Sequence, residues 1–256
     1  MRILITNDDG IQDTGIRALA DAAIRRGHEV LISAPASECS ANSQHITLTH
    51  PLMVRKVEWE GATAYSVEGT PCDCVRLGPF LTENKHFDFC LSGINRGDNA
   101  GSAVYYSGTV AAAREAAMMY VPSMAVSIVR GATEEMYKNL AEKAVELAEH
   151  FEGEKLPRFT VMNLNAPKLP PEKVKPMVVC PLDTGYFLDT YELRLSPNNR
   201  PYYWVQEVDT AELPIEPTTP GSDRYFLQEG HMTCSFVGHF GDENGKYTEK
   251  MQEMLK

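Results

Sequence analysis

Runs of apolar residues and helix-like spacings alternate along the first part of the chain. Residues 2–6 (RILIT) form an apolar run typical of a buried strand, and residues 29–35 (EVLISAP) form a second one. Between them, over 13–28, apolar residues recur every three or four positions, which predicts a helix that Gly27 ends. This strand–helix–strand start favours a parallel sheet, in which functional sites lie at the carboxyl ends of the strands.

The same alternation continues as far as Pro167. Further strands are predicted at 62–68, 87–92, 123–129 and 159–167, and further helices at 71–78, 110–120 and 134–151. The loop at 37–51 is polar and runs into a β-prone stretch. The pattern therefore predicts an α/β fold with a mostly parallel sheet.

The segment after Pro167 has a different character, because it is rich in prolines, aromatic residues and turn signals. Residues 185–206 predict β-hairpins or an extended arm rather than another β–α–β unit, and residues 224–240 predict a final pair of strands. We therefore expect a core over residues 1–170 and a β-rich extension over 171–256 that joins copies of the chain.

Polar residues able to bind a cation stand at the predicted ends of three strands. Asp8 and Asp9 follow the first strand, and Asn95 follows the strand at 87–92. The loop after the second strand contains Ser37, Ser40 and Ser43. Two adjacent carboxylates repel each other and resist burial, so something must offset their charge. Carboxylate, amide and hydroxyl oxygens together suit Mg²⁺, Mn²⁺ or Ca²⁺.

A second group of residues is suited to bind a phosphate. Ser107, Gly108 and Thr109 open the helix predicted at 110–120, where free backbone N–H groups and the helix dipole attract anions. Each piece alone is more often a turn, a surface loop or a helix cap than part of a binding site. The functional interpretation depends on their meeting at one edge of the sheet, because a cation facing a phosphate site serves phosphoryl transfer or phosphate-ester hydrolysis.

Composition narrows the class of protein. The chain has 256 residues and a formal net charge of -11, which argues against general binding to nucleic-acid polymers or anionic membranes. Its six cysteines are scattered with no C-x-x-C pair, so we expect reduced thiols. No secretory signal and no run of about 18 apolar residues is visible. These features indicate a soluble, cytoplasmic protein.

Several segments, taken in order, resemble the SurE family of survival-protein nucleotidases. They are ILITNDDGIQDTGIRAL, SAPASECSANSQHITL, VEGTPCDCVRLG, LSGINRGDNAGSAVYYSGTVAAAREA and VMNLNAP, and they cover about residues 1–167. The resemblance implies a Rossmann-like three-layer α/β/α fold whose C-terminal arm is exchanged within a homodimer or homotetramer. It also implies a metal-dependent 5'-nucleotidase, a phosphoric monoester hydrolase acting on nucleoside 5'-monophosphates, with 3'-nucleotides and polyphosphate left open as further substrates.

The resemblance also assigns roles to individual residues. The ligands of one divalent cation per subunit would be Asp8, Asp9, Ser40 and Asn95. The substrate phosphate would be bound by Asn99, Ser107, Gly108 and Thr109. Asp8 and Asp9 would also be the catalytic residues. The cation would be Mg²⁺ or Mn²⁺, with Ca²⁺ as a non-physiological occupant.

Two residues depart from the family pattern near this site. Ala41 replaces a glycine and restricts a backbone that glycine leaves free, and His45 replaces a serine. These changes motivate an alternative, a non-catalytic nucleotide-binding regulatory protein on the same fold. A sugar-nucleotide glycosyltransferase is a weaker alternative, because the chain lacks room for a second complete Rossmann domain and its first strand ends in acids.

Overall fold

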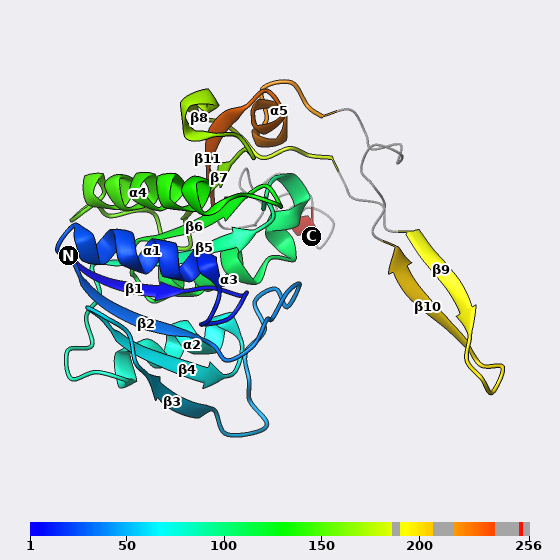
Figure 1. Cartoon of the computed structure of the whole chain (residues 1–256), viewed down its shortest axis with the longest axis horizontal. Helices are drawn as coiled ribbons and strands as arrows, with labels where there is room; N and C mark the ends of the chain where they lie inside the picture. Colours follow the sequence, from blue (N-terminus) through cyan, green and yellow to red (C-terminus); the bar gives the residue numbers. More distant parts are fainter. Residues whose placement is uncertain (186–189, 207–217, 239–250, 253–256) are drawn as a thin grey trace.

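The computed structural model describes residues 1–185, 190–206, 218–238 and 251–252. In this part of the chain the main sheet has nine strands, in the order β3-β4-β2-β1-β5-β6-β7-β11-β8 (Figure 1). These strands are β1 (Arg2–Thr6), β2 (Glu29–Pro35), β3 (Met53–Val57), β4 (Thr63–Glu68), β5 (Phe89–Arg96), β6 (Ser123–Ile128), β7 (Val161–Ala166), β8 (Lys175–Val179) and β11 (His231–Val237). The α-helices are α1 (Thr14–Arg25), α2 (Pro71–Leu77), α3 (Gly108–Met118), α4 (Glu134–His150) and α5 (Asp223–Gln228). Short 3-10 turns lie at η1 (Gly78–Phe80), η2 (Gly101–Tyr105) and η3 (Pro171–Lys173).

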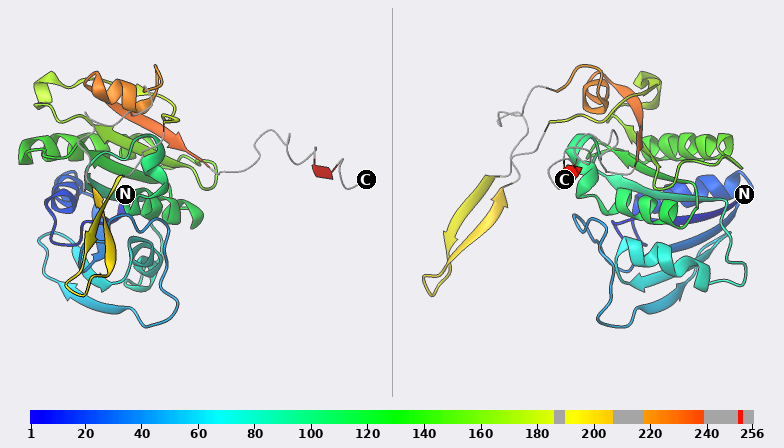
Figure 2. Two further views of the ribbon diagram at one scale, coloured as in Figure 1. Left: turned by 90° about the vertical axis from the view of Figure 1, so that its right-hand side faces the viewer. Right: turned by 180° about the vertical axis from the view of Figure 1, so that it is seen from behind.

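Helices cover both faces of the sheet because alternate residues of a buried strand point to opposite faces. In β1, Ile3 and Ile5 belong to the core cluster that includes α1 and α4. Leu4, between them, belongs to the cluster formed with α2 and α3. Figure 2 shows the resulting helix–sheet–helix layers. The expected three-layer α/β/α fold with a mostly parallel sheet is confirmed.

The parallel strands β4, β2, β1, β5, β6 and β7 bring their following loops to one edge of the sheet. Thr6 of β1 pairs with Ser92 of β5, so the loops with the expected ligands begin at neighbouring positions. At this edge β5 also approaches β6 very closely, since a Cβ on Gly93 would lie 2.2 Å from the carbonyl oxygen of Val126. Only glycine fits there.

Part of the C-terminal segment joins the main sheet, which the sequence pattern did not predict. β11 pairs antiparallel with β7, and β8 pairs parallel with β11. The C-terminal segment therefore adds two strands to the main sheet, and α5 lies between them in the sequence. The boundary expected between residues 170 and 171 stays a prediction.

The prediction of a final pair of strands at 224–240 was wrong. α5 occupies the start of this segment, and β11 is its one strand among the described residues. The physical reason lies in Ser222, whose side chain accepts a hydrogen bond from the Tyr225 N–H and caps the helix. A local cap therefore outweighs the β-propensity of the aromatic residues that follow it.

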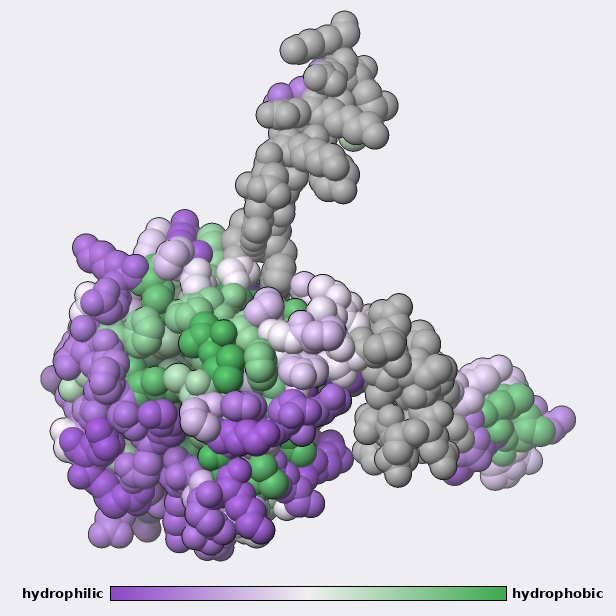
Figure 3. Space-filling model, turned by 90° about the horizontal axis from the view of Figure 1, so that it is seen from above, coloured by the Kyte–Doolittle hydropathy of each residue, from purple (hydrophilic) through white to green (hydrophobic). Residues whose placement is uncertain are grey.

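A two-stranded hairpin, β9 (Thr190–Leu195) paired antiparallel with β10 (Pro201–Gln206), projects from the core (Figures 1 and 2). The hairpin expected within 185–206 is thus confirmed. Many of its large apolar side chains are exposed: Tyr191, Leu193, Leu195, Tyr202, Tyr203, Trp204 and Val205. In Figure 3 the part that projects at the right carries a green area beside paler residues.

Two expectations from composition can be compared with the fold. All six cysteines are free thiols, as expected. Burial raises the pKa of Cys72 and of Cys90 to about 12, so both thiols are unreactive near neutral pH. Across the described ranges, no helix is both long enough and apolar enough to cross a membrane.

Candidate active site

A cavity of about 790 Å³ opens at the carboxyl edge of the parallel strands. Most of the residues expected at the site line it, namely Asp8, Asp9, Ser40, Asn95, Asn99 and Ser107. The remaining two, Gly108 and Thr109, lie directly behind Asp8. Residues from the loops after β1, β2 and β5 and from the start of α3 therefore meet in one place.

Asp8 is a buried carboxylate held by the first turn of α3. Its side chain is 4% exposed, and its Oδ1 accepts a hydrogen bond from the Thr109 hydroxyl. Gly108 leaves room for it, because a Cβ at that position would lie 2.9 Å from the Cβ of Asp8. Burial raises the pKa of Asp8 from 3.8 to about 6, although the bond from Thr109 acts to lower it.

Asp9 is paired with Arg96, which follows Asn95 at the end of β5. The Arg96 backbone N–H donates to Asp9 Oδ2 at 3.2 Å, and Arg96 Nε donates to Asp9 Oδ1 at 3.1 Å. Burial raises the pKa of the Asp9 carboxyl, and the bonds from Arg96 oppose that rise. Arg96 was not among the residues expected at the site. The signal that could have found it is the need for a positive charge near two adjacent acids.

Asn95 and Ser40 each use one polar atom within the protein and keep another for a ligand. The Asn95 amide nitrogen donates to the Gly97 carbonyl at 2.7 Å, which leaves its amide oxygen as the atom able to bind a cation. The Ser40 hydroxyl donates to Glu38 Oε1 at 2.7 Å, which leaves the lone pairs of its oxygen. Both side chains can therefore act as oxygen ligands.

The loop that carries Ser40 is anchored by the segment VEGTPCDCV. Asp73 accepts hydrogen bonds from the backbone N–H groups of Thr47 and Thr70, and the Thr70 hydroxyl donates to the His45 carbonyl at 2.6 Å. Burial acts to raise the pKa of Asp73, but the bonds from Thr47 and Thr70 outweigh it, so this pKa lies below its ordinary value. These anchors hold residues 45–50 as a loop, and the β-prone stretch expected there forms no strand.

The two departures from the family pattern occupy different places in this loop. Ala41 lines the cavity and has a φ of +57°, a left-handed conformation that costs an alanine more than a glycine. The His45 side chain is not among the residues that line the cavity. Its carbonyl, held by Thr70, serves the anchoring of the loop instead.

Asn99 is held by polar side chains from the two neighbouring strands. Its amide nitrogen donates to the Ser127 hydroxyl at 2.8 Å, and its backbone N–H donates to Asn165 Oδ1 at 2.8 Å. Asn163 donates to the Asn99 carbonyl at 2.8 Å. Neither Asn163 nor Asn165 was expected at the site. Their signal was two amides inside an otherwise apolar strand, VMNLNA.

Ser107 begins α3 and faces the cavity. Its side-chain oxygen accepts a hydrogen bond from the Val110 N–H at 3.1 Å, which makes it the N-cap. The hydroxyl proton stays available to donate to a ligand. The first N–H groups of α3 have no partner within the helix, so this end of the cavity favours an anion.

The donor set can be compared with known kinds of metal site. Within the described ranges, no three Asp, Glu, His or Cys side chains are grouped so that they could hold a metal ion. A cation in this cavity would therefore need Asn95 and Ser40 in addition to the two aspartates. Such a set of hard oxygen donors suits Mg²⁺ or Mn²⁺ rather than a thiolate- or imidazole-bound metal.

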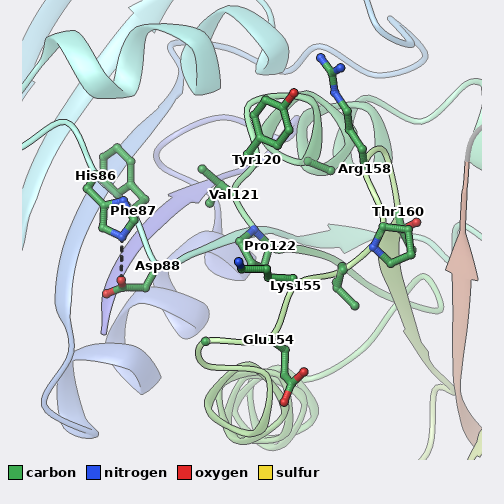
Figure 4. Close-up of a pocket in the computed structure, with 14 residues that line it drawn as sticks. His86, Phe87, Asp88, Tyr120, Val121, Pro122, Glu154, Lys155, Arg158 and Thr160 are labelled. Carbon is green, nitrogen blue, oxygen red and sulfur yellow. Dashed lines mark hydrogen bonds and ion pairs between the residues drawn. The ribbon is translucent and has the colours of Figure 1, made fainter.

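A second cavity, of about 530 Å³, lies at the opposite edge of the sheet, where the chain enters β5, β6 and β7 (Figure 4). Its rim includes Arg158, whose guanidinium lies 4.7 Å from the centre of the Tyr120 ring. None of the residues expected to bind a cation or a phosphate lines this cavity. The candidate active site is therefore the cavity that contains Asp8 and Asp9.

Comparison with known proteins agrees with this arrangement. A family model described as "Survival protein SurE" matches residues 3–187. Proteins named 5'-nucleotidase SurE from Solidesulfovibrio magneticus and Maridesulfovibrio salexigens are each 42% identical to the chain, over 92% of its length and over 90% and 92% of their own. The crystal structure of the SurE protein from Aquifex aeolicus has a TM-score of 0.80 at 29% identity and covers 99% of this chain and 100% of that one. On these matches, the chain belongs to the SurE family.

Proposed function

We propose that the chain is a divalent-cation-dependent 5'-nucleotidase that releases phosphate from nucleoside 5'-monophosphates. The observation that carries the proposal is the meeting of Asp8, Asp9, Asn95 and Ser40 in one cavity beside the N-terminus of α3. Relatives that are 42% identical bear the name 5'-nucleotidase SurE, which supports the same reaction. Substrates such as 3'-nucleotides and polyphosphate would use the same apparatus.

The residues of the cavity fit one divalent cation. Asp8, Asp9, Asn95 and Ser40 would hold it, because each offers an oxygen and the buried Asp8 carboxylate needs a positive charge nearby. When bound, the cation would polarise a phosphate oxygen and lower the pKa of an attacking water. Thr109 acts as a positioning residue, since its hydroxyl keeps Asp8 in place.

The phosphate would be bound by the start of α3 and by Asn99. Ser107 can donate its hydroxyl proton, and Gly108 offers a backbone N–H at the start of the helix. The Thr109 backbone N–H already bonds the Asp8 carboxylate, so Thr109 would act on the phosphate through Asp8. Asn99 keeps its second amide N–H for the same anion, since the first is used by Ser127. Together these donors would stabilise charge that develops on the phosphoryl oxygens.

The cavity is also large enough for more than a phosphate. Its wall includes the half-exposed Tyr106 and Val205 of β10, which supply apolar surface that a nucleoside would cover. Arg130 completes this part of the lining. A nucleotide is therefore a better match to the cavity than inorganic phosphate alone.

Phosphate release from a panel of 5'- and 3'-nucleoside monophosphates and polyphosphate, with Mg²⁺, Mn²⁺ or EDTA, tests the proposal. We expect release from 5'-nucleotides that needs the cation and that is lost in Asp9→Asn. Folded protein that binds nucleotides tightly but releases no phosphate with any cation would refute it. That result would favour the regulatory alternative, with Ala41 the first residue to revert to glycine.

We also propose that residues 171–256 include an arm exchanged between subunits, in a homodimer or homotetramer. The exposed apolar side chains of the β9–β10 hairpin support this, because a lone chain would leave them in water. Light scattering should give the mass of two or four chains, and Tyr203→Ser with Trp204→Ser should shift it toward one. A monomeric wild-type protein at micromolar concentration would contradict the exchange.

A further inference from the structure

Arg96 makes ion pairs with three acidic side chains around the candidate active site. Its Nε lies 3.1 Å from Asp9 Oδ1 and 3.2 Å from Asp13 Oδ2, and its Nη2 lies 3.3 Å from Glu38 Oε2. The Asp9 and Asp13 side chains are only 5% and 10% exposed. The guanidinium therefore offsets two nearly buried carboxylates and a third at the surface.

Arg96 also occupies both oxygens of an expected metal ligand. The Oδ2 of Asp9 accepts from the Arg96 backbone N–H, and its Oδ1 accepts from Nε. A divalent cation that takes Asp9 as a ligand must share these oxygens with Arg96 or displace its side chain. Either way, two positive groups compete for one carboxylate.

The same guanidinium reaches a second expected ligand through Glu38. One oxygen of Glu38 pairs with Arg96, and the other accepts the hydroxyl proton of Ser40. Arg96 is thus linked to the loops that carry Asp9 and Ser40, and it directly follows Asn95 in the chain. It could help the cation by holding these ligands in place, or hinder the cation by its charge.

The magnitudes decide between these two effects. A unit charge about 4 Å from a divalent cation weakens binding on the order of thirtyfold even with the dielectric of water. A partly exposed ion pair that orients a ligand contributes less than about fivefold to an equilibrium constant. Arg96 is 48% exposed, so the lower estimate of the repulsion applies, and it still exceeds the gain from orientation.

We propose that Arg96 is a built-in competitor of the divalent cation and sets how weakly this chain binds it. The inference rests on the proposed function, because it takes Asp9 as a metal ligand. The Arg96 guanidinium pairs with the carboxylates of Asp9, Asp13 and Glu38, and a cation bound to Asp9 would replace part of this pairing.

Mn²⁺ affinity of the full-length protein tests the proposal. The dissociation constant is measured by chelator competition on protein purified with Mn²⁺, so that each variant stays folded. Arg96→Gln removes the charge and should tighten Mn²⁺ binding about tenfold. Arg96→Lys keeps the charge and should stay within about threefold of wild type. Arg26→Gln, which removes an arginine paired with Glu149 on another surface, is the matched control and should change nothing.

Thermal unfolding gives a second readout that does not depend on turnover. In EDTA, Arg96→Gln should unfold at a lower temperature than wild type, because Asp9 and Asp13 lose their counter-charge. Saturating Mn²⁺ should then raise its unfolding temperature by more than it raises that of wild type. Unchanged or weaker Mn²⁺ binding by Arg96→Gln would overturn the competitor role. Absence of Mn²⁺ binding in wild type and variants alike would instead refute the metal site on which it rests.

Discussion

Replacing Asp8 by asparagine is expected to stabilise the metal-free protein at neutral pH while abolishing turnover. Asp8 is 4% exposed, and burial raises its pKa from 3.8 to about 6. A carboxyl whose pKa is raised in the folded state favours folding when it is protonated. The stability of the wild type should therefore fall as pH rises from about 4 through about 6, since the unfolded chain gives up this proton first.

The size of the effect follows from the same shift. A pKa that is about two units higher in the folded state costs the wild type about 3 kcal/mol of folding stability at pH 7.5. At pH 4 the same shift costs less than about 1 kcal/mol. Asparagine removes the charge but keeps an oxygen that can accept from the Thr109 hydroxyl. Its new amide N–H adds a cost that does not change with pH. The stability difference between Asp8→Asn and wild type should thus grow by about 2 kcal/mol between these two pH values.

Urea denaturation in EDTA at pH 4 and pH 7.5 measures this difference. Asp88→Asn is a control of opposite sign, because a hydrogen bond from the Arg2 backbone N–H lowers the pKa of Asp88. Asp88→Asn should therefore destabilise the protein more at pH 7.5 than at pH 4. A difference for Asp8→Asn that stays constant with pH, or that shrinks, would refute the reasoning. With Mn²⁺, phosphate release by Asp8→Asn should fall at least about a hundredfold.

Three further changes test the surroundings of the site. Gly108→Ala places a methyl group 2.9 Å from the Asp8 Cβ and should cost about 1–3 kcal/mol of stability by denaturation and weaken Mn²⁺ binding in chelator competition. Thr109→Val keeps the shape but removes the hydroxyl that holds Asp8, so kcat/KM should fall about 10–100-fold. An unchanged kcat/KM would show that Thr109 does not position Asp8. Ala41→Gly relieves a left-handed φ of +57° and should stabilise the protein by up to about 1 kcal/mol in urea denaturation, whereas destabilisation would show that the loop needs the stiffer residue.

The short-range features of the fold were predictable because they depend on neighbouring residues. Apolar runs and three- to four-residue spacings placed β1, α1, β2 and the strands β4 to β7, and the start of α3 at Ser107 followed from its cap. The strand β3 was not predicted. The prediction of secondary structure was wrong in part of the segment after Pro167. There the cap at Ser222 turned an expected strand into α5, and β8 and β11 entered the main sheet.

The candidate site was predictable only in part, for a related reason. Parallel strands place their carboxyl ends at one edge, so acids after β1 and an amide at the end of β5 could be expected to meet. The serine that completes the set could not be chosen among Ser37, Ser40 and Ser43 from the residues alone. It took the family resemblance to single out Ser40, which lines the cavity.

Most of the strand–helix alternation up to Pro167, the oxygen-rich loops and the family could be predicted from the sequence alone. These follow from local periodicity, capping and motifs, each of which spans a few residues. The distant side chains that hold these loops in place are known only from the folded structure. Arg96 meets Asp9 across 87 positions, and Asn163 meets the Asn99 carbonyl across 64. Such pairs depend on strand order and register in the folded sheet, which the neighbours of a residue in the chain do not specify.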